Sequence, residues 1–440
     1  MVRSALAVFL LLLAACAISG VALADKVVLM AWTDPSRWQG LVDGFLADNP
    51  DWPHEVEIQV TPQSGAPYRE SLLTMLAGGA GPDIWLVDPA WLEFHQWIRD
   101  GLFVEDLTFY MDRDGVPADS MWPVFKDLGG DGARLFALPL HVLPAAMFYN
   151  KTRLAEVGYP DPASLYFAGD WTFQQFADAS RVVTRDLNGD NEADQWAVEP
   201  GLLFAERTWP FVWSAGGDYF DAEVTRSLAD SPGTIAGIQF MADLYHELGV
   251  AAPPHIPGSP NGFVAGHYEF VLNWGSLAGT FARSQSQMNF EWGIVPPPKA
   301  DANANHYTPT VVGLWVLNKD SRVKDAAWDL LKWLGSPAGN LAWLRATYFH
   351  GIAHPAIFQS DYFLNLISEP GWPGEFAYVL YDLYMNHARS RPYFPEAAEW
   401  ERMANEYFAQ IRQGSIPVQT ALSELARRTD ALLSTGSAAN

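Results

Sequence analysis

The chain has 440 residues, of which 49% are hydrophobic and 18% charged, which is typical of globular proteins and excludes an intrinsically disordered chain. Its length exceeds that of one ordinary hydrophobic core, so we expect two domains. The formal net charge of -24 argues against nucleic acid or an anionic membrane as a partner, because both attract basic surfaces.

The first 24 residues predict an export signal. A single basic residue, Arg3, precedes the apolar run 5–24, which ends in Ala22-Leu23-Ala24. This pattern is typical of a signal peptide, 1–24, that is cleaved before Asp25. An alternative is a lipoprotein signal at Leu13-Ala14-Ala15-Cys16, with Cys16, the only cysteine, carrying the lipid anchor. In either case the mature chain has no disulfide, and no later apolar run approaches the ~20 residues that a membrane span needs.

Strand and helix patterns alternate after the signal. Apolar β-branched runs predict strands at 26–32, 55–60 and 83–87, and stripes of apolar residues predict helices at 40–50 and from Pro67 onward. This β-α-β-α-β order is typical of a parallel sheet covered by helices.

The glycine-rich segment "AGGAGPDIWLVDPAW" (77–91) allows two interpretations. A phosphate-binding loop would follow a strand and open a helix, whereas these glycines precede a strand and no Lys-Ser/Thr follows them. The favoured interpretation is that Gly78 and Gly79 end a helix in a left-handed cap and that Pro82 prevents the helix from continuing.

The carboxyl ends of the three strands predict a ligand site. In open α/β sheets, ligands bind beyond these ends. The residues that follow the strands are Trp32 to Asp34, Thr61 to Ser64 and Asp88 to Trp91. We therefore expect them to meet at one edge of the sheet.

A second unit begins after residue 145. We expect strands at its start and at 270–276, 292–295 and 310–317, and we expect the last 45 residues to be helical. Further helices are expected at 169–186, 234–249 and 324–336. With no long low-complexity linker, the two units must be joined by several short crossings.

The ordered set of segments resembles a known family, the extracellular solute-binding proteins of ABC importers, in particular the maltose-binding-protein-like sugar-binding group (family 1). The resemblance covers nearly all of 26–433. Its pieces, in family order, include "LLTMLAGGAGPDIWLVD" (72–88), "ALPLHVLPAAMFYNKTRLAEVGY" (137–159), "WSAGGDYFD" (213–221), "FVAGHYEFVLNWGS" (263–276) and "GLWVLNKDSRVKDAAWDLLKWL" (313–334).

The resemblance implies an α/β fold of the two-lobed periplasmic-binding-protein type, also called a Venus flytrap. In such a fold, helices flank parallel-rich sheets, and three crossings join the lobes. It places the N-lobe at 25–144 and 313–356, and the C-lobe at 145–312 and 357–440. It further implies a carbohydrate ligand in the interlobe cleft, a membrane permease as partner, a periplasmic location, and neither catalysis nor a cofactor. We also expect a monomer.

Sugars present apolar faces and polar edges, so a sugar site needs aromatic platforms beside carboxylates or amides. Trp274 is the first candidate platform, because it follows a strand where this family stacks a sugar ring. The other candidate platforms are Trp32, Trp91, Trp213 and Trp315. The candidate hydrogen-bonding groups are Asp34, Gln63, Asp88, Asp218 and Asn273. Asp83, at the start of its strand, is expected to have a structural role instead.

The segment "DLNGDNEAD" (186–194) resembles a calcium loop in spacing. Asp186, Asn188, Asp190 and Asp194 occupy loop positions 1, 3, 5 and 9, but the bidentate acid at position 12 is missing. The segment therefore predicts either a structural Ca²⁺ site or an acidic surface turn.

The favoured function is that of a transport binding protein. The alternatives are a secreted carbohydrate-active hydrolase, or a binding protein for a non-sugar solute such as a polyol or a glycerol phosphodiester. A hydrolase would also need aromatics and paired carboxylates, but no catalytic motif is visible.

Overall fold

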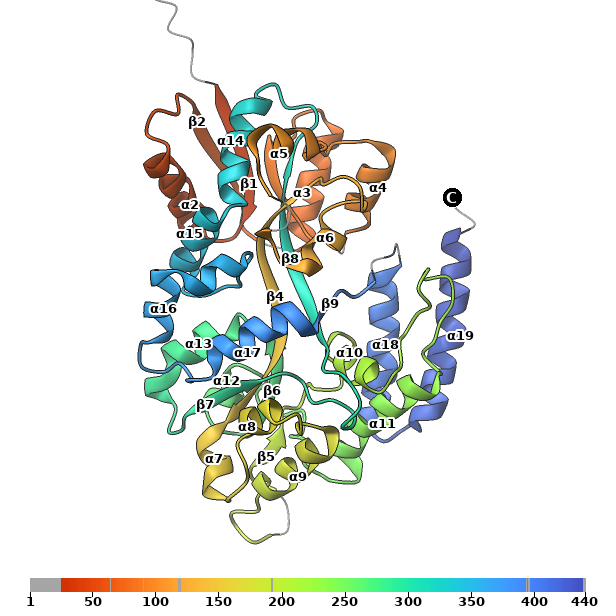
Figure 1. Cartoon of the computed structure of the whole chain (residues 1–440). Coiled ribbons are helices and arrows are strands. Elements are labelled where there is room, and N and C mark those ends of the chain that lie inside the picture. Colours follow the sequence, from red (N-terminus) through yellow and green to blue (C-terminus); the bar gives the residue numbers. More distant parts are fainter. Residues whose placement is uncertain are drawn as a thin grey trace, which may run out of the picture.

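The computed structural model describes residues 25–437, apart from 64, 90, 118–119, 191–192, 393 and 395. The expected signal peptide and Cys16 lie outside the described residues. Figure 1 shows an upper and a lower lobe, with two long strands running between them. Among the described helices, none combines the length and the low polarity that crossing a membrane requires.

The upper lobe begins with the expected alternation of strands and helices. Asp34 caps the first helix by accepting a hydrogen bond from the Ser36 backbone N–H, and Pro35 occupies its first turn. The early elements are β1 (Lys26–Trp32), α2 (Pro35–Asp48), β2 (Glu55–Thr61), α3 (Ala66–Ala77), β3 (Ile84–Val87), α4 (Leu92–Asp100), α5 (Thr108–Asp114) and α6 (Pro123–Leu128).

The glycine-rich segment ends a helix, as predicted. Helix α3 stops at Ala77, and Gly79 adopts a left-handed φ of 67° before the chain enters β3. A residue with a Cβ atom rarely adopts that backbone conformation. The segment therefore precedes a strand, and the phosphate-loop interpretation is wrong.

Two long strands, β4 (Leu138–Asn150) and β8 (Thr308–Leu317), belong to both lobes. Their mutual pairing is antiparallel and runs from Leu138 opposite Trp315 to Pro144 opposite Thr310. The strand order is β2-β1-β3-β8-β4-β6-β5, with β7 paired to β4 and β9 to β8. Pairing is parallel among β1, β2 and β3 and antiparallel where β4 and β8 cross. Because β4 and β8 each run through both lobes, they tie the lobes together at the waist.

The lower lobe is built around the far half of β4. Beyond the crossing, β4 pairs with β6 and β7 instead of β8. Its elements are α7 (Lys151–Glu156), α8 (Pro162–Phe167), α9 (Phe173–Val183), β5 (Trp196–Val198), α10 (Ala205–Ser214), α11 (Pro232–His246), α12 (Asn261–Val264), β6 (Tyr268–Trp274), α13 (Leu277–Ser284) and β7 (Trp292–Val295).

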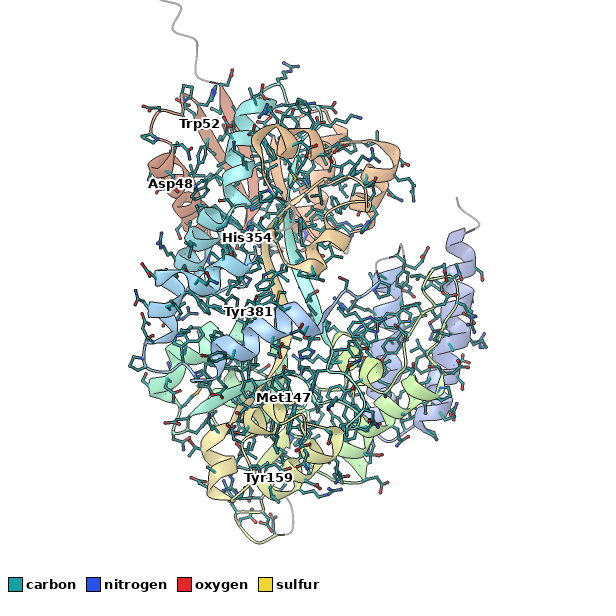
Figure 2. All side chains as sticks on the ribbon, in the orientation of Figure 1. Asp48, Trp52, Met147, Tyr159, His354 and Tyr381 are labelled. Atoms are coloured by element: carbon teal, nitrogen blue, oxygen red, sulfur yellow. The ribbon has the colours of Figure 1, made fainter. Side chains whose placement is uncertain are left out.

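After β8 the chain returns to the upper lobe and then crosses once more. Helices α14 (Lys324–Leu334) and α15 (Pro337–Thr347) cover the upper sheet (Figure 1). Side chains at the waist, among them His354 and Tyr381, are labelled in Figure 2. The chain then passes through α16 (Asp361–Ile367), α17 (Phe376–Asp382), a π-helix (Leu383–His387) and β9 (Ala388–Arg389), and ends with α18 (Ala397–Arg412) and α19 (Val418–Ser437).

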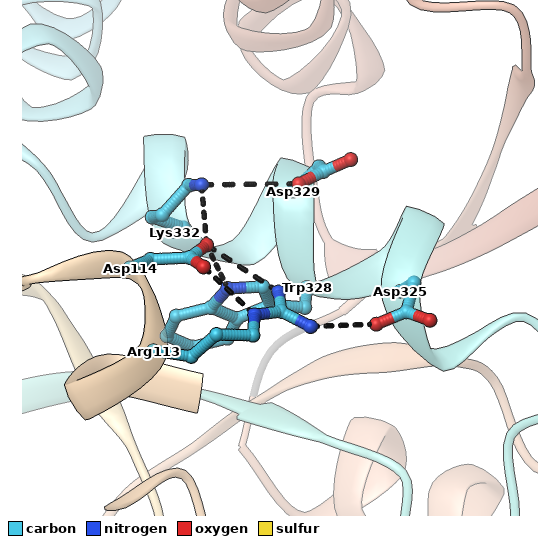
Figure 3. A network of polar contacts seen from close by, with 6 residues as sticks. All are labelled: Arg113, Asp114, Asp325, Trp328, Asp329 and Lys332. Carbon is cyan, nitrogen blue, oxygen red and sulfur yellow. Dashed lines mark hydrogen bonds and ion pairs between the residues drawn. The ribbon is translucent and has the colours of Figure 1, made fainter. Parts of the chain in front are cut away.

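A polar network fixes α14 to the early part of the upper lobe (Figure 3). Asp114, at the end of α5, accepts hydrogen bonds from Trp328 Nε1 at 2.9 Å and from Lys332 Nζ at 2.7 Å. Arg113 bonds to Asp325 at 2.9 Å. Hydrogen bonds from Arg113, Lys332 and Trp328 lower the pKa of Asp114. The network joins residues more than 200 positions apart, so the late helix packs as part of the first lobe. The lobe boundaries expected from the sequence remain a prediction.

Candidate functional site

A cavity of about 240 Å³ is lined by residues of both lobes. The upper lobe contributes Arg69, Asp88 and Trp91. The lower lobe contributes Trp209, Arg391, Pro392, Phe394, Ala397, Ala398, Trp400 and Glu401. Indoles and charged side chains thus line one cavity, which is the mixture that recognition of a polyhydroxylated ligand requires.

The upper wall of this interlobe cavity is organised around Tyr68. This buried residue packs edge-on against Trp32, with ring centroids 5.0 Å apart, and lies 5.9 Å from the ring of Trp91. Its hydroxyl donates to the backbone oxygen of Leu86 at 3.1 Å, and burial raises its pKa. Asp88 follows β3 and its backbone oxygen accepts from the Trp91 N–H at 2.9 Å. The carboxyl ends of β1 and β3 therefore meet, as expected.

Asp34 and Gln63 are exposed and line none of the cavities described in the structure. The carboxylate of Asp34 accepts from the backbone and the hydroxyl of Ser36, at 3.0 and 2.6 Å, and these bonds lower its pKa. The backbone oxygen of Gln63 accepts from Thr61 Oγ1 at 2.9 Å. Ligand contact by either side chain remains a prediction.

A smaller pocket of about 80 Å³ lies at the end of β6, beside Trp274. Trp274 is partly buried and lies opposite Ala145 of β4 in the register. Asn273 donates from Nδ2 to Ser259 Oγ at 2.9 Å, and its Oδ1 accepts from the Trp274 N–H at 2.8 Å. The remaining lining residues are Glu206, Arg207, Leu272 and Pro309. The structure therefore brings Asn273 and Trp274 together in one polar pocket.

An ion pair supports the floor of this pocket. Arg207 lies 2.8 Å from Glu199, whose side chain is only 1% exposed. Glu199 also accepts from the Leu272 N–H at 3.1 Å and from Ser259 at 3.3 Å. Burial raises the pKa of Glu199, and the neighbouring guanidinium opposes that rise. The pair holds Arg207 and the end of β6 in place.

Trp213 and Asp218 come together through Arg389. The guanidinium lies 4.5 Å from the Trp213 ring centroid and 2.7 Å from Asp218 Oδ2. A cation over an indole face is an attractive arrangement. Trp213 is 3% exposed, and its ring also packs 5.1 Å from that of Trp209, which lines the interlobe cavity. Trp213 thus supports the cavity wall.

Trp315 is fully buried in β8, and its ring packs edge-on against Trp38 at 5.7 Å. It lines none of the cavities described in the structure. In this arrangement it stabilises the upper-lobe core, and a contact with ligand remains a prediction.

Several lining residues carried no recognisable signal in the sequence. Trp400 belongs to an apolar helical stripe that is typical of a core, and Trp209 lies within an aromatic helix. Both indole N–H groups are buried without a hydrogen-bond partner among the described residues. Arg391 follows β9 and pairs with Glu401 at 2.9 Å. Only the tertiary structure places these side chains opposite Asp88 and Trp91.

A larger hollow of about 400 Å³ lies at the opposite edge of the upper sheet. Its lining includes Lys26, Gly79, Asp83, Asn318 and Arg322. It opens at the amino ends of β1 and β3, where open α/β sheets do not bind ligands. There Asp83 accepts from the Val28 N–H at 2.8 Å and from Ser321 Oγ at 2.6 Å, which is the structural role expected of it.

The acidic loop at 186–194 uses its carboxylates internally. Asp186 accepts from the Gly189 N–H at 2.6 Å, and Asp194 accepts from the Leu187 N–H at 2.7 Å. Asn188 accepts from the Asp190 N–H at 2.8 Å. Among the residues that the structure describes, no three His, Cys, Asp or Glu side chains form a group that could hold a metal. Asn191 lies outside the described residues, and calcium binding remains a prediction.

Two lobes, two strands shared between them and a cavity lined by both define a two-lobed ligand-binding fold. Residues 31–341 match the family model of the bacterial extracellular solute-binding proteins. The chain belongs to this family, and it is therefore a solute-binding protein.

Solved structures share this fold at low sequence identity. The sugar-binding protein MalE from Xanthomonas citri has a TM-score of 0.76 and 20% identity, covering 93% of this chain and 98% of that one. A Rhizobium etli sugar transporter in an open conformation has a TM-score of 0.74 and 20% identity, covering 93% and 100%. A Listeria monocytogenes ABC substrate-binding protein in complex with cycloalternan has a TM-score of 0.74 and 16% identity, covering 93% and 99%.

Proposed function

We propose that the protein is the substrate-binding component of an ABC importer and captures a sugar or oligosaccharide in the interlobe cavity. The observation that carries this proposal is the composition of that cavity, in which Trp91, Trp209 and Trp400 lie among charged side chains from both lobes. Indole faces stack on the C–H faces of a sugar ring, and carboxylates and guanidiniums bond to its hydroxyls.

Trp274 offers a second aromatic face in the lower lobe. It lies beside Asn273, Glu206 and Arg207 in its own small pocket. A saccharide longer than one ring could stack on Trp274 while another ring occupies the interlobe cavity. The similar structures from Xanthomonas citri and Listeria monocytogenes bear titles that name sugar-binding or cycloalternan-bound proteins, which supports a saccharide as the ligand here.

Binding would be coupled to bending between the lobes. A ligand that touches Asp88 and Trp91 on one side and Trp209 and Trp400 on the other is bound better when the lobes close. Closure removes water from the cavity and strengthens each polar contact. The closed shape would then be recognised by the permease subunits in the membrane, and the energy for transport would come from the partner ATPase.

No bond of the ligand has to change in this mechanism, so no nucleophile or general base is required. A secreted hydrolase is the alternative, and incubation with maltose and maltotriose separates the two. We expect chromatography to recover both sugars unchanged, whereas shorter products would show an enzyme.

The protein would act outside the cytoplasm, in the periplasm, after cleavage before Asp25. The name of the family, extracellular solute-binding proteins, supports export. Mass spectrometry of protein from the native host tests the processing. A mass that begins at Asp25 supports simple cleavage, and a lipid-bearing mass beginning at Cys16 shows an anchored lipoprotein. We expect a monomer.

A thermal-shift screen tests the proposed function. A ligand that binds only the folded state raises the melting temperature. We expect at least one neutral mono- or oligosaccharide to do so at millimolar concentration. A screen in which only glycerol phosphodiesters or polyols stabilise the protein would favour the non-sugar alternative, and no shift with any sugar would contradict the proposal.

A further inference from the structure

We infer that the lower lobe contains a second ligand site, in which Arg153 and Arg185 hold a small oxoanion such as sulfate or phosphate. The inference goes beyond the proposed function and does not depend on it. The site is a cavity of about 110 Å³ that shares no lining residue with the interlobe cavity or with the pocket beside Trp274. Arg153 belongs to α7 and Arg185 follows α9, and both helices lie at the base of the lower lobe, away from the waist (Figure 1).

The oxoanion cavity is polar and small. Besides the two arginines, its lining includes Glu156, Gln195, Glu269 and Asn289. A single water needs about 10–15 Å³ of such space, so the cavity has room for several waters or for one small oxoanion. It offers no aromatic face of the kind on which a sugar ring would stack, apart from Phe290 at its edge. Its ligand is therefore expected to differ in chemistry from that of the interlobe cavity.

Each of the two guanidiniums has one buried donor without an acceptor. The Nε atoms of Arg153 and Arg185 have no hydrogen-bond partner among the described residues, and Arg153 is only 8% exposed. Their other contacts use the terminal nitrogens, with Arg153 Nη1 donating to Glu156 at 3.2 Å and Arg185 Nη2 donating to Gln195 Oε1. Buried polar groups almost always have a partner in the protein or in bound solvent. The missing acceptors are therefore expected inside the cavity.

The charges around the cavity favour an anion over water as that acceptor. Burial and then the positive charge of Arg153 lower the pKa of Arg185, which shows that the two cations act on each other. Glu156 is 58% exposed, so solvent screens its charge. Glu269 is fully buried, and burial raises its pKa to about 7, so it is mostly neutral in more acidic solution. An oxoanion supplies both the missing charge and the missing acceptor atoms.

Oxoanion binding should be linked to the protonation of Glu269. The charged groups that act on this carboxyl group are Arg153 and Glu156 from α7 and Arg185 from the segment after α9. An ionised Glu269 repels the anion and competes for the same guanidiniums, whereas a protonated one does neither. Binding should therefore take up a proton, and the dissociation constant should be about tenfold larger at pH 8 than at pH 6.

Calorimetric titration of sulfate into the protein tests the inference, because sulfate keeps its charge across this pH range. We expect saturation at about 10 mM sulfate or below at pH 6, and the uptake of about one proton per sulfate at pH 8, measured from the heats in two buffers of different ionisation enthalpy. The net charge of -24 opposes non-specific anion binding. Absence of sulfate binding at pH 6 would show that the cavity holds water alone, and equal affinity at both pH values would also overturn the inference.

Three variants locate the bound sulfate. Arg185→Gln removes one guanidinium and should weaken sulfate binding at least about tenfold. Glu269→Gln cannot ionise, so it should bind sulfate as tightly at pH 8 as at pH 6. The matched control is Arg181→Gln, because Arg181 lies on the same helix, α9, but bonds to Asp178 at 2.7 Å on the exposed surface. Unchanged binding in folded Arg185→Gln, or a pH dependence that persists in Glu269→Gln, would overturn the inference.

Discussion

The rings of Trp122 and Tyr384 lie nearly parallel, with centroids 4.5 Å apart and an interplanar angle of 7°. Trp122 precedes α6 in the upper lobe, and Tyr384 lies in the π-helix that leads into β9. Trp122 Nε1 donates to the Ile352 oxygen at 2.8 Å, and Tyr384 donates to the Val142 oxygen of β4 at 2.7 Å. The stack therefore joins α6 to two of the segments that pass between the lobes. Any bending at the waist has to accommodate it.

Tyr384→Phe should remove the hydrogen bonds of the hydroxyl while the ring stack on Trp122 remains. In Tyr384→Phe the buried Ile352 N–H, which now donates to the hydroxyl at 3.0 Å, loses its acceptor. An unsatisfied buried donor costs about 1–3 kcal/mol, so the free energy of unfolding in urea should fall by that amount. Tyr378→Phe is the control, because Tyr378 is 73% exposed on α17. Equal losses of unfolding free energy in the two variants would show that the buried hydroxyl of Tyr384 stabilises the protein no more than an exposed hydroxyl does.

Trp274→Ala should weaken binding of the sugar found in the thermal-shift screen. Loss of an aromatic anchor in a mostly enclosed site costs about 1–3 kcal/mol of binding free energy, measured by calorimetry. Trp333→Ala provides a matched control. Trp333 is also partly buried, but it bonds to Asp48 on α2, within the upper lobe and away from both cavities. An unchanged dissociation constant with a lowered melting temperature in Trp274→Ala would mean that this indole serves the core alone.

Because Glu269 is a buried acid, we predict that the unfolding free energy of the protein depends on pH. Glu269 lies in β6 with no exposed surface, beside Arg153, Arg185 and Asn150. Burial, opposed by Asn150 and by the two guanidiniums, raises its pKa from 4.5 to about 7. In the folded state the group therefore holds its proton over a range where the unfolded chain has lost it. Its contribution to stability is largest below pH 4.5 and is lost as the pH rises towards about 7.

Glu269→Gln removes this titration. Relative to the wild type, the variant should gain about 3 kcal/mol in unfolding free energy between pH 4.5 and pH 8. The control Glu291→Gln alters an exposed acid of the same lobe and should show no such trend. A difference in unfolding free energy between the wild type and Glu269→Gln that stays constant with pH would contradict the raised pKa of Glu269.

Calcium titration tests the loop at 186–194. If the loop binds Ca²⁺, chelator-treated protein should release or absorb heat on titration and should gain melting temperature at millimolar Ca²⁺. Asp186→Asn should abolish both effects. No heat and no stabilisation would leave only the acidic turn, whose carboxylates already accept backbone hydrogen bonds.

The upper-lobe alternation could be predicted because its signals are local. Strand β1 coincides residue for residue with the strand predicted at 26–32. The glycines after α3 end that helix where expected. The position of Asp88 and Trp91 at a cavity could also be predicted, because strand order alone determines which ends meet.

The opposite wall of the cavity could not be predicted. Trp209 and Trp400, whose ring centroids lie 5.7 Å apart in this wall, come from helices far apart in the chain, and nothing near either residue indicates the other. Trp315 illustrates a second difficulty. Almost every residue of β8 is buried, so no alternation of polar and apolar residues separates core indoles from ligand-facing ones. The sequence distinguishes Trp274 from the core indoles only because Trp274 ends its strand.

The most direct test of the account is small-angle scattering with and without the sugar that stabilises the protein. Lobes joined by β4, β8 and the passage through β9 should close around a ligand that contacts both walls of the interlobe cavity. We predict a smaller radius of gyration for the saturated protein than for the free protein at the same concentration. Superimposable profiles with a tightly bound sugar, together with free and bound crystals that share one interlobe angle, would contradict capture by closure.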